Sequence, residues 1–214
     1  MMTKKSLMIL GNSNVGKSSI TKLLLPNPRK FKGKSGKQPG STLLINYISQ
    51  DKLPYQIVDL PGFGFMTKSS HRREEHIKKQ VVLHIEKDYQ SYFLSLIVIN
   101  ILRIEDELNK YFIQNKETIP LSFELITLIN ELRIPSLVLF NKIDKVSKYD
   151  MKKNIAFFLK HAKDFGLNLT HLDDYESKDG LSIPYLEFSA LKKINLNKLL
   201  KFITFVFNQA KQLK

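Results

Sequence analysis

The sequence predicts an α/β fold in which a mostly parallel, six-stranded sheet is flanked by about five helices. Short apolar runs alternate with amphipathic segments in the order β-α-β-β-α-β-α-β-α-β-α, which is typical of parallel strands joined by helical crossovers. The 214 residues contain no internal repeat and no Gly/Ser-rich linker. We therefore expect residues 1–214 to form a single domain with a substantial core.

The expected strands are short apolar runs bounded by turn residues. The first, Leu7–Leu10, is uninterrupted, as a strand buried on both faces requires. The second and third lie on either side of a turn at 51–54, and the fourth is the longest apolar run of the chain. The six strands are expected at residues 7–10, 43–49, 55–60, 94–102, 136–141 and 184–189.

The expected helices are recognised by their apolar spacing and by their end signals. In the segment 72–89 apolar residues recur at every fourth position, which places them on one helical face. Asp150 and Asn195 are expected to cap the helices that they precede, and residues 168–182 are expected to be a polar loop. The helices are expected at 18–25, at 72–89, from Pro120 to 132, from Asp150 to Gly166, and from Asn195 onwards.

Residues 11–18 read GNSNVGKS and match the P-loop pattern G-x-x-x-x-G-K-[ST] between the first strand and the first helix. Glycines let the backbone turn tightly, so that its N–H groups and the helix N-terminus face phosphate oxygens. Lys17 is expected to reach the β- and γ-phosphates, and the Ser18 hydroxyl to bind Mg²⁺. The expected nucleotide contacts here are Gly11, Asn12, Ser13, Asn14, Val15, Gly16, Lys17, Ser18 and Ser19.

Two further motifs lie where predicted strands end, which is the edge at which open α/β sheets bind ligands. In DLPG, Asp59 is expected to hold Mg²⁺ through its water shell, and Gly62 to bring its backbone N–H to the γ-phosphate. In NKID, Asp144 can accept hydrogen bonds from guanine N1–H and the exocyclic amine, which adenine lacks. The stem of Lys142 can cover the base, and Asn141 belongs to the same motif. These motifs predict a guanine-nucleotide site.

Two further motifs complete this prediction. The sequence SAL, Ser189–Leu191, follows the sixth strand, where the N–H of Ala190 is expected to bind guanine O6. The sequence GKQPGST ends at Thr42, where a switch loop would bring a hydroxyl to Mg²⁺ and the γ-phosphate. The expected metal ligands are Ser18, Thr42 and Asp59, and the expected catalytic groups are Lys17, Thr42 and Gly62.

The motifs GNSNVGKSS, KQPGST, DLPGFGFM, NKID and FSA resemble those of the translation-factor-related P-loop GTPases. Within these, the sequence is similar to the EngB (YihA-type) family of ribosome-biogenesis GTPases, and especially to its archaeal-type members, from about Lys4 to Asn208. The resemblance implies a P-loop NTPase G domain that binds GTP or GDP with Mg²⁺, hydrolyses GTP and assists assembly of the large ribosomal subunit. One departure is Asn100, which ends the fourth strand where the family usually has aspartate.

The residue after D-x-x-G affects the expected rate of GTP hydrolysis. Ras-like proteins have a glutamine there that orients water, whereas this chain has Phe63, which cannot hydrogen-bond to water. We therefore expect slow unassisted hydrolysis, on the order of 10⁻⁴ s⁻¹. A K⁺ ion could supply the missing charge, because Asn14 resembles the P-loop asparagine of cation-dependent GTPases. The other candidate is an RNA or ribosomal partner that reorganises the switch loops. The alternative is that Asn14 only satisfies backbone groups of the loop.

The charge of the chain bears on its partners. Thirty-four Lys and Arg against twenty Asp and Glu give a net charge of +14. This is typical of a nucleic-acid binder, although a solvated lysine-rich surface explains it equally well. The cations expected to face rRNA or a ribosomal subunit are Lys30, Lys32, Lys34, Lys37, His71, Arg72, Arg73, Lys78 and Lys79. Two other functions remain open: a GTP-gated RNA-binding module with little or no hydrolysis, and a Ras-like signalling switch.

The composition also excludes some classes of protein. No cysteine is present, so disulfides and thiolate metal sites are excluded. The longest apolar run is too short to span a bilayer, and the first residues lead directly into the first strand. We expect a cytoplasmic protein without membrane association, and a monomer, although the sequence does not determine the oligomeric state.

Overall fold

The computed structural model describes residues 4–31, 45–62, 71–112, 119–176 and 182–212. Its strands are β1 (Ser6–Gly11), β2 (Asn46–Ile48), β3 (Gln56–Asp59), β4 (Tyr92–Asn100), β5 (Ser136–Asn141), β6 (Leu169–His171) and β7 (Ile183–Phe188). They form one sheet in the order β2-β3-β1-β4-β5-β7-β6, in which only the β2–β3 pair is antiparallel. The mostly parallel α/β fold is confirmed. The described residues contain seven strands rather than six, because β6 lies in the segment expected to be a loop.

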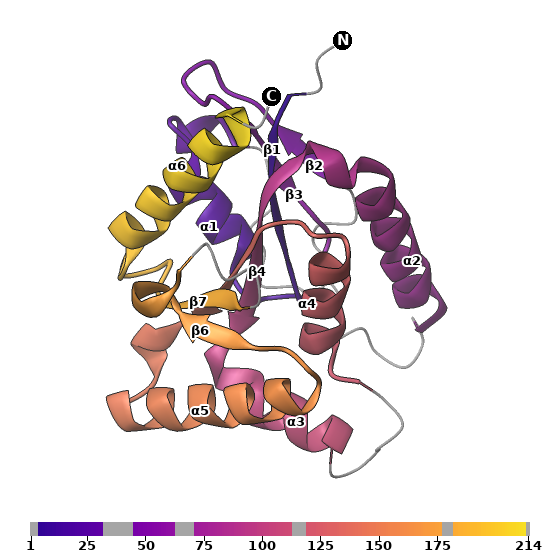
Figure 1. The fold of residues 1–214 in the computed structure, drawn as a ribbon, viewed down its shortest axis with the longest axis vertical. Coiled ribbons are helices and arrows are strands. Elements are labelled where there is room, and N and C mark those ends of the chain that lie inside the picture. The colour runs from indigo at the N-terminus through magenta and orange to yellow at the C-terminus, as the bar shows by residue number, and fades with distance from the viewer. Residues whose placement is uncertain (1–3, 32–44, 63–70, 113–118, 177–181, 213–214) are drawn as a thin grey trace.

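Helices cover both faces of the sheet (Figure 1). They are α1 (Lys17–Leu24), α2 (His71–Asp88), α3 (Ile104–Phe112), α4 (Leu121–Glu131), α5 (Lys148–Asp164) and α6 (Leu196–Gln212). Helices α1 and α6 cover one face, and α2 to α5 cover the other. The five expected helices are present, whereas α3 was not predicted. It packs against α5.

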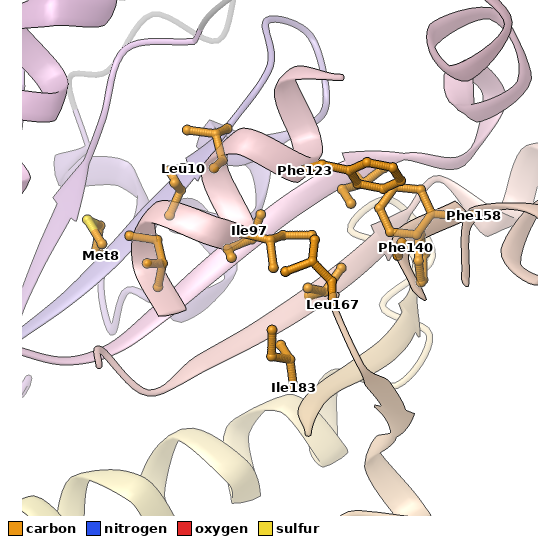
Figure 2. Close-up of a cluster of buried hydrophobic side chains, with 14 of the residues drawn as sticks. Met8, Leu10, Ile97, Phe123, Phe140, Phe158, Leu167 and Ile183 are labelled. Atoms are coloured by element: carbon orange, nitrogen blue, oxygen red, sulfur yellow. The ribbon is translucent and has the colours of Figure 1, made fainter. Parts of the chain in front are cut away.

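The two faces of the sheet explain the uninterrupted apolar run of β1. Successive side chains of a strand point to opposite faces, so Met8 and Leu10 join one buried cluster, and Leu7 and Ile9 join the other. Figure 2 shows the first cluster, in which aromatic side chains of α4, β5 and α5 meet. The ring of Phe158 lies with its centroid 5.0 Å from that of Phe123 and 5.1 Å from that of Phe140. Such packing on both faces holds the sheet in place, and the carboxyl ends of its strands then position the functional loops.

The start of α5 differs from the expectation. Asp150 lies inside the helix, and the cap is Ser147, whose hydroxyl oxygen accepts a hydrogen bond of 3.0 Å from the Asp150 N–H. Serine followed three residues later by an acidic residue resembles a capping box. Before α6, Asn195 donates its side-chain amide to the Glu187 carbonyl at 2.8 Å. This bond ties the start of α6 to β7.

None of the described helices is both long enough and apolar enough to cross a membrane.

Candidate nucleotide-binding site

The loop between β1 and α1 begins and ends with glycines that no other residue could replace without strain. Gly11 has φ +143°, and a Cβ there would lie 2.2 Å from the Val98 carbonyl oxygen of β4. Gly16 has φ +106°, and a Cβ there would lie 2.3 Å from Asn141 Nδ2. No side chain caps α1 at Gly16, so the first N–H groups of α1 remain available to an anion. The loop therefore has the geometry that phosphate binding requires.

Lys17 opens α1, and its side chain turns back over this loop. Only 7% exposed, it donates from Nζ to the Gly11 carbonyl at 3.0 Å and to the Asn12 carbonyl at 2.9 Å. An ammonium group has three protons, so one remains for a phosphate oxygen. Burial lowers the pKa of Lys17 to about 8, and the Asp59 carboxylate partly opposes that change. The side chain is therefore mostly charged at pH 7.

Asp59 ends β3 beside Lys17 and is 1% exposed. Its Oδ2 accepts a hydrogen bond of 3.5 Å from the Ser18 hydroxyl, whereas its Oδ1 is buried and finds no partner in the described part of the chain. Burial raises the pKa of Asp59 to about 6, opposed by the charge of Lys17 and by the Ser18 hydrogen bond. A polar oxygen buried without a partner is costly. It would be satisfied by a bound cation or by the water shell of one.

These oxygen groups fit Mg²⁺, which prefers oxygen ligands and is usually held by one or two carboxylates together with phosphates and water. Among the described residues there is no group of three His, Cys, Asp or Glu side chains that could hold a metal. Thr42, the third expected ligand, lies outside the described residues. Phe63 lies outside them as well, and its effect on water remains a prediction.

Gly62 brings the chain after β3 against the P-loop. A Cβ at this position would lie 2.7 Å from Lys17 Nζ and 2.9 Å from the backbone Cα of Ser13. The contact with backbone atoms means that only glycine fits there. The structure thus places Gly62, as expected from the D-x-x-G motif, beside the group predicted to bind the γ-phosphate.

Asn141 joins three loops at the end of β5. Its side chain is 2% exposed, donates from Nδ2 to the Val15 carbonyl at 2.7 Å, and accepts at Oδ1 from the Ala190 N–H at 3.0 Å. The P-loop, the NKID loop and the loop after β7 are therefore held together by one amide group. The Ala190 N–H is engaged by Asn141 in this structure, and its expected contact with guanine O6 remains a prediction.

The residues after Asn141 complete the same junction. Lys142 has a left-handed backbone (φ 72°), and its Nζ donates to the Asn14 carbonyl of the P-loop. Burial lowers the pKa of Lys142, and the nearby charges of Lys145 and Arg103 lower it further. The P-loop and the NKID loop are therefore linked by a second side chain.

Ser189 positions the acid expected to recognise guanine. It is fully buried, donates its hydroxyl to Asp144 Oδ1 at 2.5 Å, and accepts at the same oxygen from the Lys192 N–H at 3.0 Å. One carboxylate oxygen of Asp144 is thereby fixed. Leu191 differs from its neighbours, because its side chain is 72% exposed.

Sequence reasoning missed Glu107, which reaches the P-loop from α3. Its Oε2 accepts from Asn12 Nδ2 at 3.3 Å, and its Oε1 accepts from the Ser122 N–H of α4 at 3.1 Å. Burial raises the pKa of Glu107, and hydrogen bonds from Ser122 and Asn12 oppose that change. The partners are 95 residues apart for Asn12 and 15 for Ser122, so local patterns could not reveal them.

Asn100, the departure noted in the sequence, is a capping residue here. Its Oδ1 accepts from the Leu102 N–H at 3.2 Å, and its position in β4 pairs with Asn141 of β5. The side chain therefore closes the turn after β4.

Among the cations expected to face RNA, Lys78 forms an ion pair with Glu124. Lys32, Lys34 and Lys37 lie outside the described residues, as do the side chains of His71, Arg72 and Arg73.

Comparisons with known proteins found a matching family model and several relatives. The family model described as 50S ribosome-binding GTPase matches residues 6–142. A probable GTP-binding protein EngB of Methanococcus aeolicus is 34% identical over 152 residues, which are 71% of this chain and 63% of the relative. The Haloquadratum walsbyi protein of the same name is 32% identical over 143 residues, 67% of each chain. The chain thus spans about two thirds of the length of these relatives.

A solved structure supports the fold. The crystal structure of a probable GTP-binding protein EngB is similar with a TM-score of 0.73, covering 95% of this chain and 99% of that one at 24% identity. The predicted P-loop GTPase fold and the resemblance inferred from the motifs are both confirmed.

Proposed function

The chain belongs to the 50S ribosome-binding GTPase family, and within it to the EngB-type proteins, and on this premise we propose that it hydrolyses GTP while assisting assembly of the large ribosomal subunit. GTP and GDP are the proposed ligands, with Mg²⁺. The ribosomal subunit or its rRNA is the proposed partner, in the cytoplasm, and the net charge of +14 supports an RNA-containing partner.

The observation that carries the proposal is the junction at Asn141, which ties the P-loop to both loops expected to hold guanine. Within it, Ser189 orients Asp144. A fixed carboxylate accepts hydrogen bonds from guanine, whereas adenine would leave it unpaired, and a buried acceptor without a donor is strongly disfavoured. The geometry therefore supports specificity for guanine over adenine.

At the phosphates, Ser18 and Asp59 would hold Mg²⁺ together with Thr42, and the ion would neutralise charge on the β- and γ-phosphates. Lys17 would donate its remaining N–H to the same phosphates, and Gly62 would present its backbone N–H. Phosphoryl transfer needs mainly positioning and charge neutralisation, which these groups provide. Because Phe63 cannot orient water, unassisted turnover is on the order of 10⁻⁴ s⁻¹.

Asn14 supports a role for K⁺ in stimulating this reaction. Its side chain is exposed and makes no hydrogen bond among the described residues, and its backbone is left-handed with φ 60°. The amide oxygen is therefore free to coordinate a cation beside the phosphates. Hydrolysis is expected to be faster in KCl than in NaCl at equal ionic strength, and Asn14→Ala should remove the difference. Equal rates in the two salts would exclude the role of K⁺.

The decisive experiment has two stages. Titration with fluorescent GTP and ATP in the presence of Mg²⁺ should show binding of GTP at least 100-fold tighter than that of ATP, and equal affinities would overturn the guanine site. Single-turnover hydrolysis is then measured with and without isolated large ribosomal subunits. Acceleration by the subunits supports the proposal. Permanent inactivity would indicate a GTP-gated RNA-binding module, and turnover indifferent to ribosomal particles would favour a signalling switch.

A further inference from the structure

We propose that the start of α5 is a binding surface for single-stranded RNA, on which an unpaired base stacks against Tyr149 while Lys145, Lys148 and Lys152 contact phosphates. The choice of RNA rests on the proposed ribosomal function. The surface adjoins the loop that holds Lys142 and Asp144.

Tyr149 is the most exposed of the large hydrophobic side chains in the described chain, at 77%. It lies in the first turn of α5, and Lys152 follows three residues later on the same side of the helix. Lys145 and Lys148, both exposed, precede it. An aromatic ring that projects among lysines is the arrangement with which single-stranded sites combine base stacking and phosphate contacts.

The positive charge of this surface is not balanced by ion pairs. The segment 142–153 contains five lysines and two aspartates. Some described lysines do pair with acids, namely Lys78 with Glu124, Lys198 with Asp173 and, on α5 itself, Lys153 with Glu105 of α3. In the described residues Lys145, Lys148 and Lys152 form no such ion pair. The cluster is therefore available to an anionic partner.

The charge extends beyond α5 toward the nucleotide site. Burial is the main cause that lowers the pKa of Lys142. Lys145 and Arg103, which lies in the 3₁₀ turn after β4, are close enough to lower it further. Lys142 in turn donates to the P-loop carbonyl of Asn14. Figure 1 shows α5 beside α3, against which it packs.

The surroundings of Tyr149 favour RNA over a protein partner. The centre of a protein interface is apolar and depleted of lysine. The exposed residues around Tyr149 are instead polar or charged, and no other apolar side chain in the first turn of α5 is exposed. They are Lys145, Ser147, Lys148, Asp150, Lys152 and Lys153. A lone ring surrounded by cations offers a base a stacking face and offers a protein little area to bury.

The test uses the full chain and a fluorescein-labelled 12-nucleotide adenylate RNA, with binding followed by anisotropy. Tyr149→Ala should weaken binding 5- to 50-fold, within the range known for loss of one stacked base, and Tyr149→Phe should stay within about twofold of the unmodified protein. The double variant Lys148→Ala/Lys152→Ala should lower both the affinity and the salt slope, the latter by about 1.4. The control, Lys160→Ala/Lys163→Ala, removes the same charge from the other end of α5 and should change neither strongly.

Three results would overturn the surface. Equal losses in the two double variants would indicate attraction by net charge alone, and an unchanged affinity in Tyr149→Ala would exclude stacking. If polyglutamate displaced the labelled RNA as effectively as unlabelled RNA does, and Tyr149→Ala weakened the binding of both competitors equally, the partner would be an acidic protein. GTP affinity, measured in parallel, separates the two proposals: RNA binding through Tyr149 without GTP binding would keep the surface and reject the proposed function.

Discussion

The two ends of the candidate site are built in opposite ways. At the base end, formed by Asn141, Asp144, Ser189 and Ala190, the side-chain groups are joined by short hydrogen bonds. The phosphate end is formed by Lys17, Ser18, Asp59 and Gly62. It contains two buried charges of opposite sign and a carboxylate oxygen without a partner among the described residues.

This difference shows which part of the site is already ordered before a nucleotide binds. A preorganised base end loses little conformational freedom on binding, so it favours specificity. At the phosphate end Lys17 and Asp59 compensate each other's burial only in part, so this end makes the nucleotide-free protein less stable than it would otherwise be. Specificity for the base therefore comes from one end of the site, and stabilisation of the protein by its ligand comes from the other.

The largest expected effect comes from breaking the base end at its centre. Asn141→Ala removes the partners of the Val15 carbonyl and the Ala190 N–H, which should lower the free energy of unfolding by about 2–4 kcal/mol. GTP affinity should fall more than 100-fold in a fluorescence titration. Asn154→Ala is the control, because Asn154 donates a single bond to the Ile101 carbonyl, away from the junction. Equal urea midpoints for the two variants would contradict a special role for Asn141.

The next effect tests the phosphate end through pH. The folded-state pKa of Asp59, about 6, lies above its ordinary value of 3.8, so the folded protein binds the proton more tightly than the unfolded chain does. This stabilisation is complete below pH 3.8 and is lost as pH rises through 6, a change of about 3 kcal/mol. In the nucleotide-free protein, Asp59→Asn should remove this part of the pH dependence, measured by urea unfolding at pH 4 and pH 7. The exposed acid Asp51 serves as the control, and an Asp59→Asn profile parallel to that of Asp51→Asn would contradict the assignment.

A smaller effect is expected at the contact that supports the P-loop from α3. Glu107→Ala removes the acceptor for Asn12 Nδ2 and the Ser122 N–H, which should cost about 1–3 kcal/mol of stability and roughly tenfold in GTP affinity. Glu107→Gln should recover most of both. Its oxygen can accept from Ser122, and its amide can donate to the buried Asn12 Oδ1, which lacks a partner in the described structure, once the Asn12 amide has rotated. Glu105→Ala on the same helix is the control; Gln no better than Ala at position 107 would show that the charge itself is required.

The smallest effect sharpens the base end alone. Ser189→Ala frees Asp144 Oδ1 without removing the carboxylate, so GTP affinity should fall about fivefold, as for the loss of one hydrogen bond of about 1 kcal/mol. The preference for GTP over ATP should fall by a similar factor, because the acid is less well oriented. Competition titrations of both nucleotides measure this change. An unaltered preference would mean that Asp144 is positioned by the backbone.

The sequence predicted those features that are written in local patterns. The apolar run of β1, the glycines of the P-loop and the acids at strand ends are each recognisable within a few residues, and the structure brings Lys17, Asp59 and Gly62 together as expected. The cap of α5 is also a local feature, although it is expected at Asp150 from the sequence and lies at Ser147 in the structure.

Other features depend on distant contacts and could not be predicted in this way. The strand β6 has only three residues, too few for a period of two to be recognised, and its place in the sheet comes from pairing with β7. Helix α3 begins after a short 3₁₀ turn that directly follows β4, so the long apolar run conceals where the strand ends. The bonds of Asn141 to Val15 and of Glu107 to Asn12 join residues 126 and 95 positions apart, which no local pattern encodes.

The Asp59 oxygen that lacks a partner in the described part of the chain has a consequence for the stability of the protein in a cell. A ligand that binds only the native state stabilises it in proportion to the logarithm of its concentration. A fall in the concentration of guanine nucleotide should therefore leave more copies open to proteases. The abundance of the protein would then follow the supply of its ligand without any change in transcription.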